Sequence, residues 1–298
     1  MVAIPNNENL ASFIGKKGSE NSITFYNRSV DGNVITALAP TSVEDKFYAV
    51  TEILTVSDTI ILSTDSLDRL FGELLIASKL LDKKVLFTDD NADSELIKNA
   101  KLSNYEICGK ERLLDGILKE NAKGDGSGEC RIDLDKAFNV KGIGTVALGI
   151  VMNGTVNVHD ELWHSSGKKA LVRSLQSQDV DVKSAGPGTR IGIGLKNMDS
   201  DEIEKGTILS SFEQRPHKRV KAKLTLSEIN RENLLPGSFY GLGSNFSYSV
   251  AKIEAVEGDI ASLALEKPLA LIKGDTFLLT REKAPRIFAK GIVEEMLD

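Results

Sequence analysis

The stretch GTVALGIV at 144–151, followed by MNGT at 152–155, decides how the middle of this chain folds. An Asn-Gly pair between apolar runs is the strongest short-range signal for a β-hairpin, so we predict a hairpin turn at Asn153-Gly154. Further short strand-like runs follow at regular spacing, which is typical of a sandwich or barrel. They occupy 161–164, 170–175 and 190–195. The sequence therefore predicts an all-β unit in the middle of the chain.

A second all-β pattern begins at Arg219, where apolar and polar residues alternate through 220–226. Alternation with a period of two is typical of a strand with one buried face. The runs 260–265 and 276–280 continue the pattern. We therefore predict a second β-barrel directly after the first.

The chain before residue 126 has a different pattern. Continuous apolar runs at 34–38, 59–62 and 84–87 suit buried parallel strands. Between the last two, apolar residues recur at near-helical spacing through 67–81, which predicts an amphipathic helix. Such strand–helix–strand repeats indicate an α/β domain with a mostly parallel sheet.

The polar, Gly-rich segment 121–129 is typical of a linker between the α/β part and the all-β part. The fold class predicted from these patterns is multidomain, α/β followed by all-β. The predicted domains are 1–126, 127–212 and 213–298.

Composition excludes several classes of protein. The 298 residues are 41% hydrophobic, enough for a core, and the spacing of two cysteines and three histidines fits neither a disulfide framework nor a zinc site. No run reaches the ~18 apolar residues of a membrane span, and the N-terminus lacks the features of a signal peptide. We therefore expect a reduced, soluble, cytoplasmic protein without a metal ion.

Several segments of the middle unit resemble the second domain of translational GTPases. The longest, IDLDKAFNVKGIGTV at 132–146, is similar to the family pattern of an Asp followed by F-x-I-x-G-x-G-T-V. The others lie at 173–179, 184–192 and 201–206. Within this family the chain is most similar to the selenocysteine-specific elongation factors, SelB.

The resemblance extends to both ends of the chain. The segments ALEKPLA at 264–270 and GDTFLL at 274–279 are similar to the third domain of the same factors. The segments 15–19 and 23–27 resemble a SelB-like paralogue group of methanogenic archaea. The resemblance implies a GTPase-like α/β domain followed by two β-barrels, which are the second and third domains of a translation factor.

A phosphate loop is implied after the strand at 2–4, where the family has G-H-V-D-H-G-K-T. Such a loop needs backbone N–H groups that converge on the phosphates, together with a cation. The two glycines, the phosphate-binding lysine and the magnesium-binding hydroxyl correspond here to Pro5 and Leu10, to Ala11 and to Ser12. Because only Ser12 fits, we predict a degenerate GTPase domain.

The other nucleotide-binding segments also depart from the family. The D-x-P-G-H segment corresponds to LAPTS at 38–42, without its Asp, Gly or His. The segment that reads guanine, and the loop beside the base, correspond to Thr88, Asp89 and Asn91 and to Cys108, Gly109 and Lys110. We therefore expect a pseudo-GTPase with no catalytic residues, no GTP or magnesium ion and no other cofactor.

SelB-like factors form a pocket for the aminoacyl group of tRNA in the second domain, from an Asp-His pair and an Arg. The matching positions are Asp135, Lys136 and Arg190, with Lys in the place of His. An Arg and a Lys beside one carboxylate suit an anionic or strongly polar group, such as phosphate or an RNA end. The alternative is a structural ion pair between Asp135 and Arg190.

Three functions remain open on the sequence alone. The first is a SelB-like protein that binds tRNA or another RNA on its barrels without hydrolysing GTP. The second is a protein-interaction scaffold that binds the ribosome or translation proteins, and the third is an active GTPase. Neither DNA nor a membrane is expected as a partner.

The net charge of −6 is not spread evenly. Residues 1–126 hold 14 Lys and Arg against 20 Asp and Glu, whereas 127–212 hold 10 against 11 and 213–298 hold 13 against 12. Excess negative charge in the first part, where Glu8, Asp89 and Asp90 match nucleotide contacts, disfavours GTP.

The charge of the two barrels leaves an RNA partner open. Lys16 and Lys17 are expected to form a solvated basic turn, or alternatively to contact a nucleic-acid backbone. Five more basic residues cluster at the start of the third domain, at Arg215, Lys218, Arg219, Lys221 and Lys223.

Overall fold

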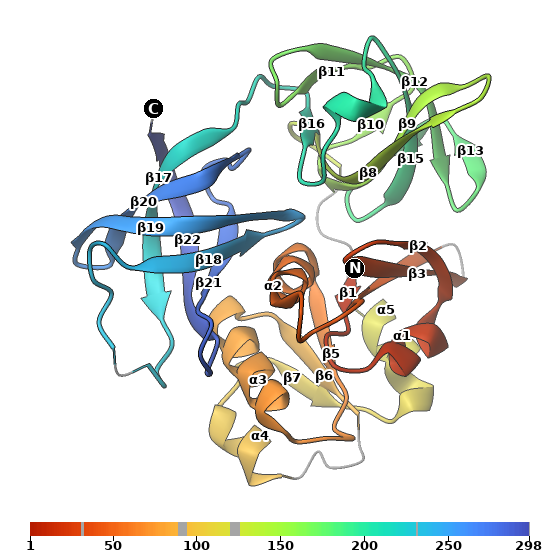
Figure 1. The fold of residues 1–298 in the computed structure, drawn as a ribbon. Coiled ribbons are helices and arrows are strands. Elements are labelled where there is room, and N and C mark those ends of the chain that lie inside the picture. Colours follow the sequence, from red (N-terminus) through yellow and green to blue (C-terminus); the bar gives the residue numbers. More distant parts are fainter. Residues whose placement is uncertain (31–32, 89–93, 120–125, 231, 298) are drawn as a thin grey trace. The chain divides into compact units, whose positions relative to one another are not determined.

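A computed structural model of the chain describes residues 1–30, 33–88, 94–119, 126–230 and 232–297 (Figure 1). The chain divides into two compact units. The first comprises 1–121, 218–267 and 273–298, and the second comprises 122–217 with 268–272. The predicted linker lies largely outside the described residues, and the predicted domain boundaries stay predictions.

The first unit contains a seven-stranded sheet that is mostly parallel, as the apolar runs predict. Five neighbouring strands of the sheet, β4 to β7 with β1 among them, run parallel, and the pairs β2–β3 and β3–β4 are antiparallel. The order is β2 (Lys16–Glu20), β3 (Ile23–Val30), β4 (Asn33–Pro40), β1 (Val2–Ala3), β5 (Thr59–Leu62), β6 (Lys84–Phe87) and β7 (Tyr105–Ile107). The predicted strands 59–62 and 84–87 coincide with β5 and β6.

Helices connect the strands of this sheet (Figure 1). They are α1 (Glu8–Ile14), α2 (Phe47–Val56), α3 (Arg69–Leu81), α4 (Glu95–Ala100), the 3₁₀ turn η1 (Lys110–Arg112) and α5 (Leu113–Leu118). The helix predicted at 67–81 begins two residues later, at Arg69, because Asp68 caps it by accepting a hydrogen bond from the Phe71 N–H at 3.0 Å. It ends where Asp82 adopts a left-handed φ of 54°.

The second unit is a closed six-stranded barrel in which β12 pairs back onto β11. Its strands, in order around the barrel, are β11 (Glu161–His164), β16 (Ile208–Ser210), β8 (Arg131–Val140), β9 (Gly144–Asn153), β15 (Arg190–Lys196) and β12 (Lys169–Ser177). Additional elements are β13 (Val180–Val182), the pair β10 (Val156–Asn157) and β14 (Ser184–Ala185), and the 3₁₀ turn η2 (Ser200–Glu202).

The predicted hairpin at Asn153-Gly154 is wrong. A turn does form there, with Gly154 at a left-handed φ of 64°, but β9 does not pair with the strand that follows it. A Cβ on Gly154 would approach the Cys130 backbone to 2.7 Å, so the glycine serves a close backbone approach. The hairpin instead joins β8 to β9 through 141–143, where Gly142 and Gly144 adopt φ values of 82° and 94°.

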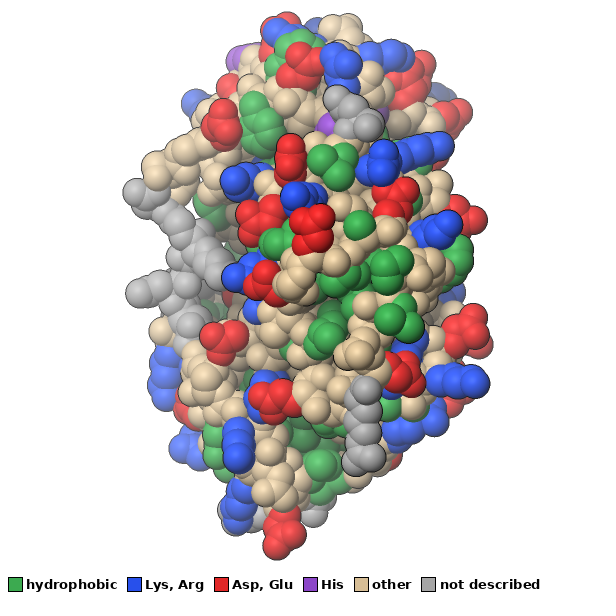
Figure 2. All heavy atoms as spheres, turned by 90° about the vertical axis from the view of Figure 1, so that its left-hand side faces the viewer, with side chains coloured by type: hydrophobic (Ala, Val, Ile, Leu, Met, Phe, Trp, Pro, Cys, Tyr) green, Lys and Arg blue, Asp and Glu red, His purple; other side chains and the backbone are tan. Residues whose placement is uncertain are grey.

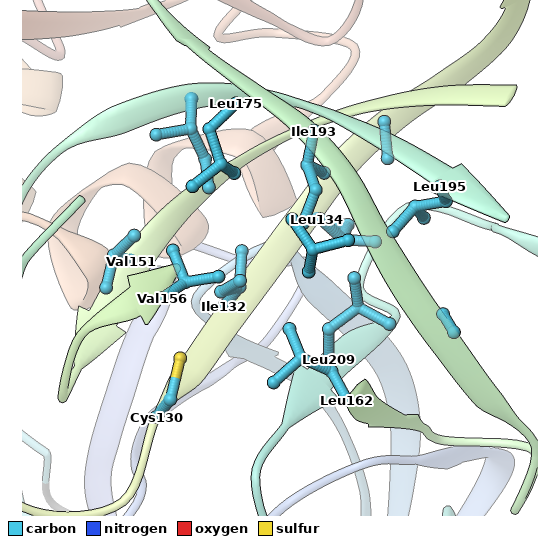
Figure 3. Close-up of a cluster of buried hydrophobic side chains, with 14 of the residues drawn as sticks. Cys130, Ile132, Leu134, Val151, Val156, Leu162, Leu175, Ile193, Leu195 and Leu209 are labelled. Carbon is cyan, nitrogen blue, oxygen red and sulfur yellow. The ribbon is translucent and has the colours of Figure 1, made fainter. Parts of the chain in front are cut away.

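Apolar side chains from all six strands fill this barrel (Figure 3). Ile132 and Leu134 of β8 point into the interior together with Val151, Leu175 and Ile193 from the neighbouring strands. Alternation along β8 therefore sends Arg131, Asp133 and Asp135 to the opposite face of the strand.

The second barrel belongs to the first unit and is also closed. Its order is β17 (His217–Leu226), β20 (Ile260–Leu269), β19 (Ser247–Glu257), β18 (Phe239–Ser244), β21 (Thr276–Thr280) and β22 (Ile287–Leu297). Helix α2 packs against β18, and helix α3 packs against β22. The α/β sheet and this barrel thus share one compact unit.

Candidate functional site

The loop between β1 and α1 lies at the carboxyl end of the parallel strands, where open α/β sheets bind ligands. Its two asparagines, Asn6 and Asn7, are held by hydrogen bonds to the loop after β5. Asn6 Nδ2 donates to the Ser63 carbonyl at 2.7 Å, and the Ser63 N–H donates to Asn6 Oδ1 at 3.0 Å. Asn7 Nδ2 donates to Ser63 Oγ at 3.1 Å and to Asp65 Oδ2 at 2.8 Å. The amide side chains of the loop are therefore bonded within the protein.

Asn7 also begins helix α1, because its Oδ1 accepts a hydrogen bond from the Leu10 N–H at 2.9 Å. The helix therefore starts at Glu8, and Leu10 and Ala11 lie within its first turns, packed into the core. Ser12 Oγ donates to the Glu8 carbonyl of the same helix at 3.2 Å. The predicted phosphate-loop positions are thus three buried residues, Pro5, Leu10 and Ala11, and the exposed Ser12.

Glu8, the first residue of α1, and Glu20 of β2 both lie near Lys17. Glu8 accepts a hydrogen bond from the buried Tyr26 hydroxyl at 2.8 Å, and Lys17 lies 3.8 Å from Glu8 and 2.8 Å from Glu20. Burial, followed by the hydrogen bond to Glu8, raises the pKa of Tyr26, and the hydrogen bond to Glu20 raises the pKa of Lys17. The expected basic turn at Lys16-Lys17 is wrong, because both residues lie in strand β2.

The segment at 38–42, which was predicted to match the D-x-P-G-H segment, is buried or hydrogen-bonded within the protein. Leu38 is buried in β4, the Thr41 N–H donates to the Ser22 carbonyl at 3.1 Å, and Ser42 Oγ donates to Asp45 at 3.0 Å. These hydroxyl residues therefore serve the local turn.

The positions matched to guanine recognition divide into two groups. Thr88 is buried, and its Oγ1 accepts a hydrogen bond from the Thr64 N–H at 2.8 Å, which ties the ends of β5 and β6 together. Cys108 and Gly109 follow β7, and Lys110 lies 3.7 Å from Asp65. The other two matched positions, Asp89 and Asn91, lie outside the described residues, as does Asp90.

Of the three residues predicted to form a pocket in the second unit, Asp135 and Arg190 are in contact and Lys136 is not part of their pair. Arg190 forms a two-point ion pair with Asp135, at 2.5 Å from Nη1 and 3.0 Å from Nη2, and both side chains are buried. Lys136 is exposed and lies outside this buried pair. Both Asp135 oxygens thus accept hydrogen bonds from one guanidinium, the geometry of a strong bidentate pair.

A second buried ion pair lies beside the first and was not predicted. Arg131 donates from Nε to Asp133 Oδ1 at 2.7 Å and from Nη2 to Oδ2 at 3.1 Å. Asp133 and Arg190 both align with Ile150 of β9, which lies between their strands. The alternation of charged and apolar residues at 131–135 was a usable signal for this charged face.

The predicted basic cluster at the start of the second barrel is largely paired with carboxylates. Arg215 lies 2.7 Å from Glu213, Arg219 lies 2.6 Å from Glu254, and Lys223 lies 3.2 Å from Asp259. Figure 2 shows acidic and basic side chains intermixed on the side of this barrel that faces the viewer. Exposed pairs of this kind are worth little and are readily exchanged for other partners.

No group of three or more His, Cys, Asp and Glu side chains among the described residues could hold a metal ion. None of the helices in these parts of the chain is long and apolar enough to span a membrane.

An α/β domain with a mostly parallel sheet, followed by two closed six-stranded barrels, is also the layout of solved structures of the translation elongation factor SelB. The family model for elongation factor Tu domain 2 matches residues 144–210, within the first barrel. In sequence, the chain is similar to selenocysteine-specific elongation factors, SelB, at 25–28% identity.

Solved structures show the same fold. SelB from Methanococcus maripaludis matches 99% of this chain and 79% of its own, with a TM-score of 0.78 in its apo form and 0.81 in complex with the GTP analogue GppNHp. The identities are 21% and 22%, so these matches establish the fold and nothing further.

Sequence relatives fall into two kinds. The uncharacterized protein MJ0325 of Methanocaldococcus jannaschii is 27% identical over 91% of both chains. The selenocysteine-specific elongation factor of the same organism is 25% identical over 69% of this chain and 46% of its own length. That of Haemophilus influenzae is 27% identical over 56% of this chain and 28% of its own length. The matched region thus covers less than half the length of these two sequence relatives.

Proposed function

We propose that this protein is a SelB-like translation-factor homologue that binds tRNA or another RNA on its β-barrels and neither binds nor hydrolyses GTP. The proposal that GTP does not bind rests on the bonding of the β1–α1 loop. Its asparagines are bonded to Ser63 and Asp65, and Ala11 stands where the family has its lysine.

Electrostatics support the same conclusion. A phosphate loop binds anions through free N–H groups and a cation, whereas here Glu8 and Asp65 place negative charge beside the loop. Lys17 and Lys110, which lie beside these two carboxylates, are each engaged in an ion pair. A triphosphate entering this loop would have to break these pairs and displace the asparagine bonds.

Calorimetry with GTP and magnesium tests the nucleotide half of the proposal. We expect no saturable heat from the full chain, with or without magnesium. Micromolar affinity would overturn this half and would favour the third function, an active GTPase.

The RNA half of the proposal is supported by the relatives, whose names are those of elongation factors, and by the near-neutral charge of the barrels. On β8, Lys136 is exposed next to the buried Asp135–Arg190 pair, and Lys141 is exposed in the β8–β9 turn. Exposed lysines of this kind suit phosphate contacts, which weaken as salt rises.

Filter binding of total tRNA at low and moderate salt tests the RNA half. We expect Lys136→Glu to weaken binding about tenfold, because one phosphate contact is replaced by repulsion. Lys101→Glu, the same change at an exposed lysine that follows α4 and lies outside the barrels, is the matched control. Equal binding of the two variants, or no binding of the unmodified protein, would contradict the RNA proposal.

A second candidate, a scaffold that binds a protein of the translation machinery, rests on exposed apolar side chains. Ile229, Leu235 and Phe239 of the second barrel are 60%, 59% and 64% exposed. Large apolar side chains are common at the centre of protein interfaces. Affinity capture from the native host that retains proteins after nuclease treatment, and loses them in Phe239→Ser, would favour this candidate.

A further inference from the structure

A cavity of about 850 Å³ lies inside the first unit, between helices α3 and α4 on one side and the β17–β22 barrel on the other. This volume is in the range that holds drug-sized ligands. Its lining is mostly apolar, and Leu96, Leu226 and Ile229 are among its wall residues although each is more than a third exposed. The cavity is separate from the loop and from the barrel pocket described above.

The carboxylates that line the cavity are all engaged by other groups. Glu73 accepts hydrogen bonds from the backbone and guanidinium of Arg286. Glu228 pairs with Lys79 at 2.7 Å, and Asp82 accepts a hydrogen bond from Ser103. Glu73 and Glu228 are therefore compensated by cations, whereas Asp82 keeps its negative charge.

Two basic residues that line the cavity have no carboxylate partner among the described residues. Lys290 on β22 is half-buried, and Arg69 at the start of α3 is exposed. A half-buried ammonium beside apolar walls is stabilised by an anion that a ligand brings with it.

Gly72 supplies a second, independent observation. It is the fourth residue of α3 and lines the cavity, and a Cβ built on it would meet no atom within 4 Å. Glycine inside a helix costs roughly 0.5–1 kcal/mol relative to alanine, so packing within the protein does not account for its presence. It leaves open space in the cavity wall.

From these features we propose that the cavity binds a small amphipathic anion, with an apolar body against α3 and the barrel and one acidic group at Lys290. The apolar walls account for the body, and the unpaired cations account for the charge. The exposed Lys79–Glu228 pair joins α3 to the barrel beside the cavity, and it is weak enough to open for entry.

Fluorescence titration with 1-anilinonaphthalene-8-sulfonate, below any micelle concentration, tests the proposal on the full chain. We expect one saturable site, from which decanoate displaces the dye and decyltrimethylammonium does not. Decyl phosphate compared with decanoate distinguishes a phosphate ligand from a carboxylate ligand. Lys290→Gln should weaken decanoate about tenfold, the usual effect of losing one charge-assisted hydrogen bond.

Two further variants separate this site from nonspecific binding. Gly72→Leu fills the open wall and should abolish dye binding, while the helix is retained by circular dichroism. Lys283→Gln, an exposed lysine that does not line the cavity, should bind like the unmodified protein. Non-saturating binding, equal affinity for the cationic amphiphile, or indifference to both Lys290→Gln and Gly72→Leu would overturn the proposal.

Discussion

Glu73 of α3 and Arg286 of the second barrel form a buried ion pair across 213 residues of sequence. Arg286 donates to Glu73 from Nη2 at 2.6 Å, from Nε at 2.9 Å and from its backbone N–H at 2.7 Å. The guanidinium carbon also lies 3.7 Å from the centre of the Phe47 ring. One arginine thus joins two helices of the α/β domain to the barrel of the same unit.

We expect Glu73→Ala to lower the free energy of unfolding by about 3 kcal/mol. Removing one partner of a buried pair leaves the other charge without compensation, which usually costs about 3–5 kcal/mol, and Arg286 keeps some solvent contact. Urea denaturation monitored by circular dichroism measures the loss, with the exposed Glu282→Ala as control. A loss no larger than that of the control would contradict a structural role for the pair.

A close approach between Gly243 of β18 and Thr51 of α2 provides a second test of this interface. A Cβ on Gly243 would come within 2.8 Å of Thr51 Cβ and still closer to its Oγ1. Gly243→Ala should therefore destabilise the protein by about 1–3 kcal/mol through overpacking.

Thermal unfolding of Gly243→Ala, alone and combined with Thr51→Ala, measures this effect. The double variant should recover part of the loss, because it removes the Oγ1 contact. Gly186→Ala is the matched control, since its Cβ would meet no atom within 4 Å. Identical melting temperatures for the two glycine variants would refute the argument.

The parts of this fold that could be predicted are those that local pattern determines. Strands β5 and β6 were predicted with correct bounds, because continuous apolar runs of four residues suit the centre of a parallel sheet. Helix α3 was predicted to within two residues, and only the cap at Asp68 shifted its start. Both barrels were predicted as a class from short runs at regular spacing.

Contacts between distant segments could not be predicted from the sequence. Nothing near Glu73 in sequence indicates Arg286 as its partner, and the pairing of Asn6 with Ser63 spans 57 residues. The hairpin prediction at Asn153-Gly154 failed because the same dipeptide also suits a turn that approaches another backbone. In the candidate pocket, Asp135 and Arg190 came from family resemblance, and the Arg131–Asp133 pair beside them was missed.

Cys130 predicts how stability depends on alkaline pH. Burial, and to a lesser degree the charge of Asp160, raises the pKa of its thiol from 9.0 to about 11. Between these values the unfolded thiol loses its proton while the folded thiol keeps it, so stability falls as pH rises from 9 to 11. The two-unit difference corresponds to roughly 3 kcal/mol at most.

Unfolding free energies at pH 8 and pH 11 test this prediction. Cys130→Ala should lose less stability over the interval than the unmodified protein. A Cys130→Ala variant with an unchanged alkaline slope would exclude the thiol as the cause.

Asn7 offers the most direct test of the β1–α1 loop. Its side chain caps α1 through the Leu10 N–H and also donates to Ser63 and Asp65. Asn7→Ala should cost about 1–2 kcal/mol, because the cap and the loop bonds are lost together. The exposed Asn9→Ala, two residues into the same helix, should cost less than about 0.5 kcal/mol and is the control.

The Asn7→Ala variant also tests whether the loop can bind a nucleotide. If the asparagine side chains merely occupied a nucleotide site, removing the bonds of Asn7 would restore GTP binding. We expect none in Asn7→Ala, because the cation that a triphosphate needs is still missing at Ala11. Equal stability of the two variants would contradict the structural role of Asn7, and GTP binding gained by Asn7→Ala would show that the loop is a latent nucleotide site.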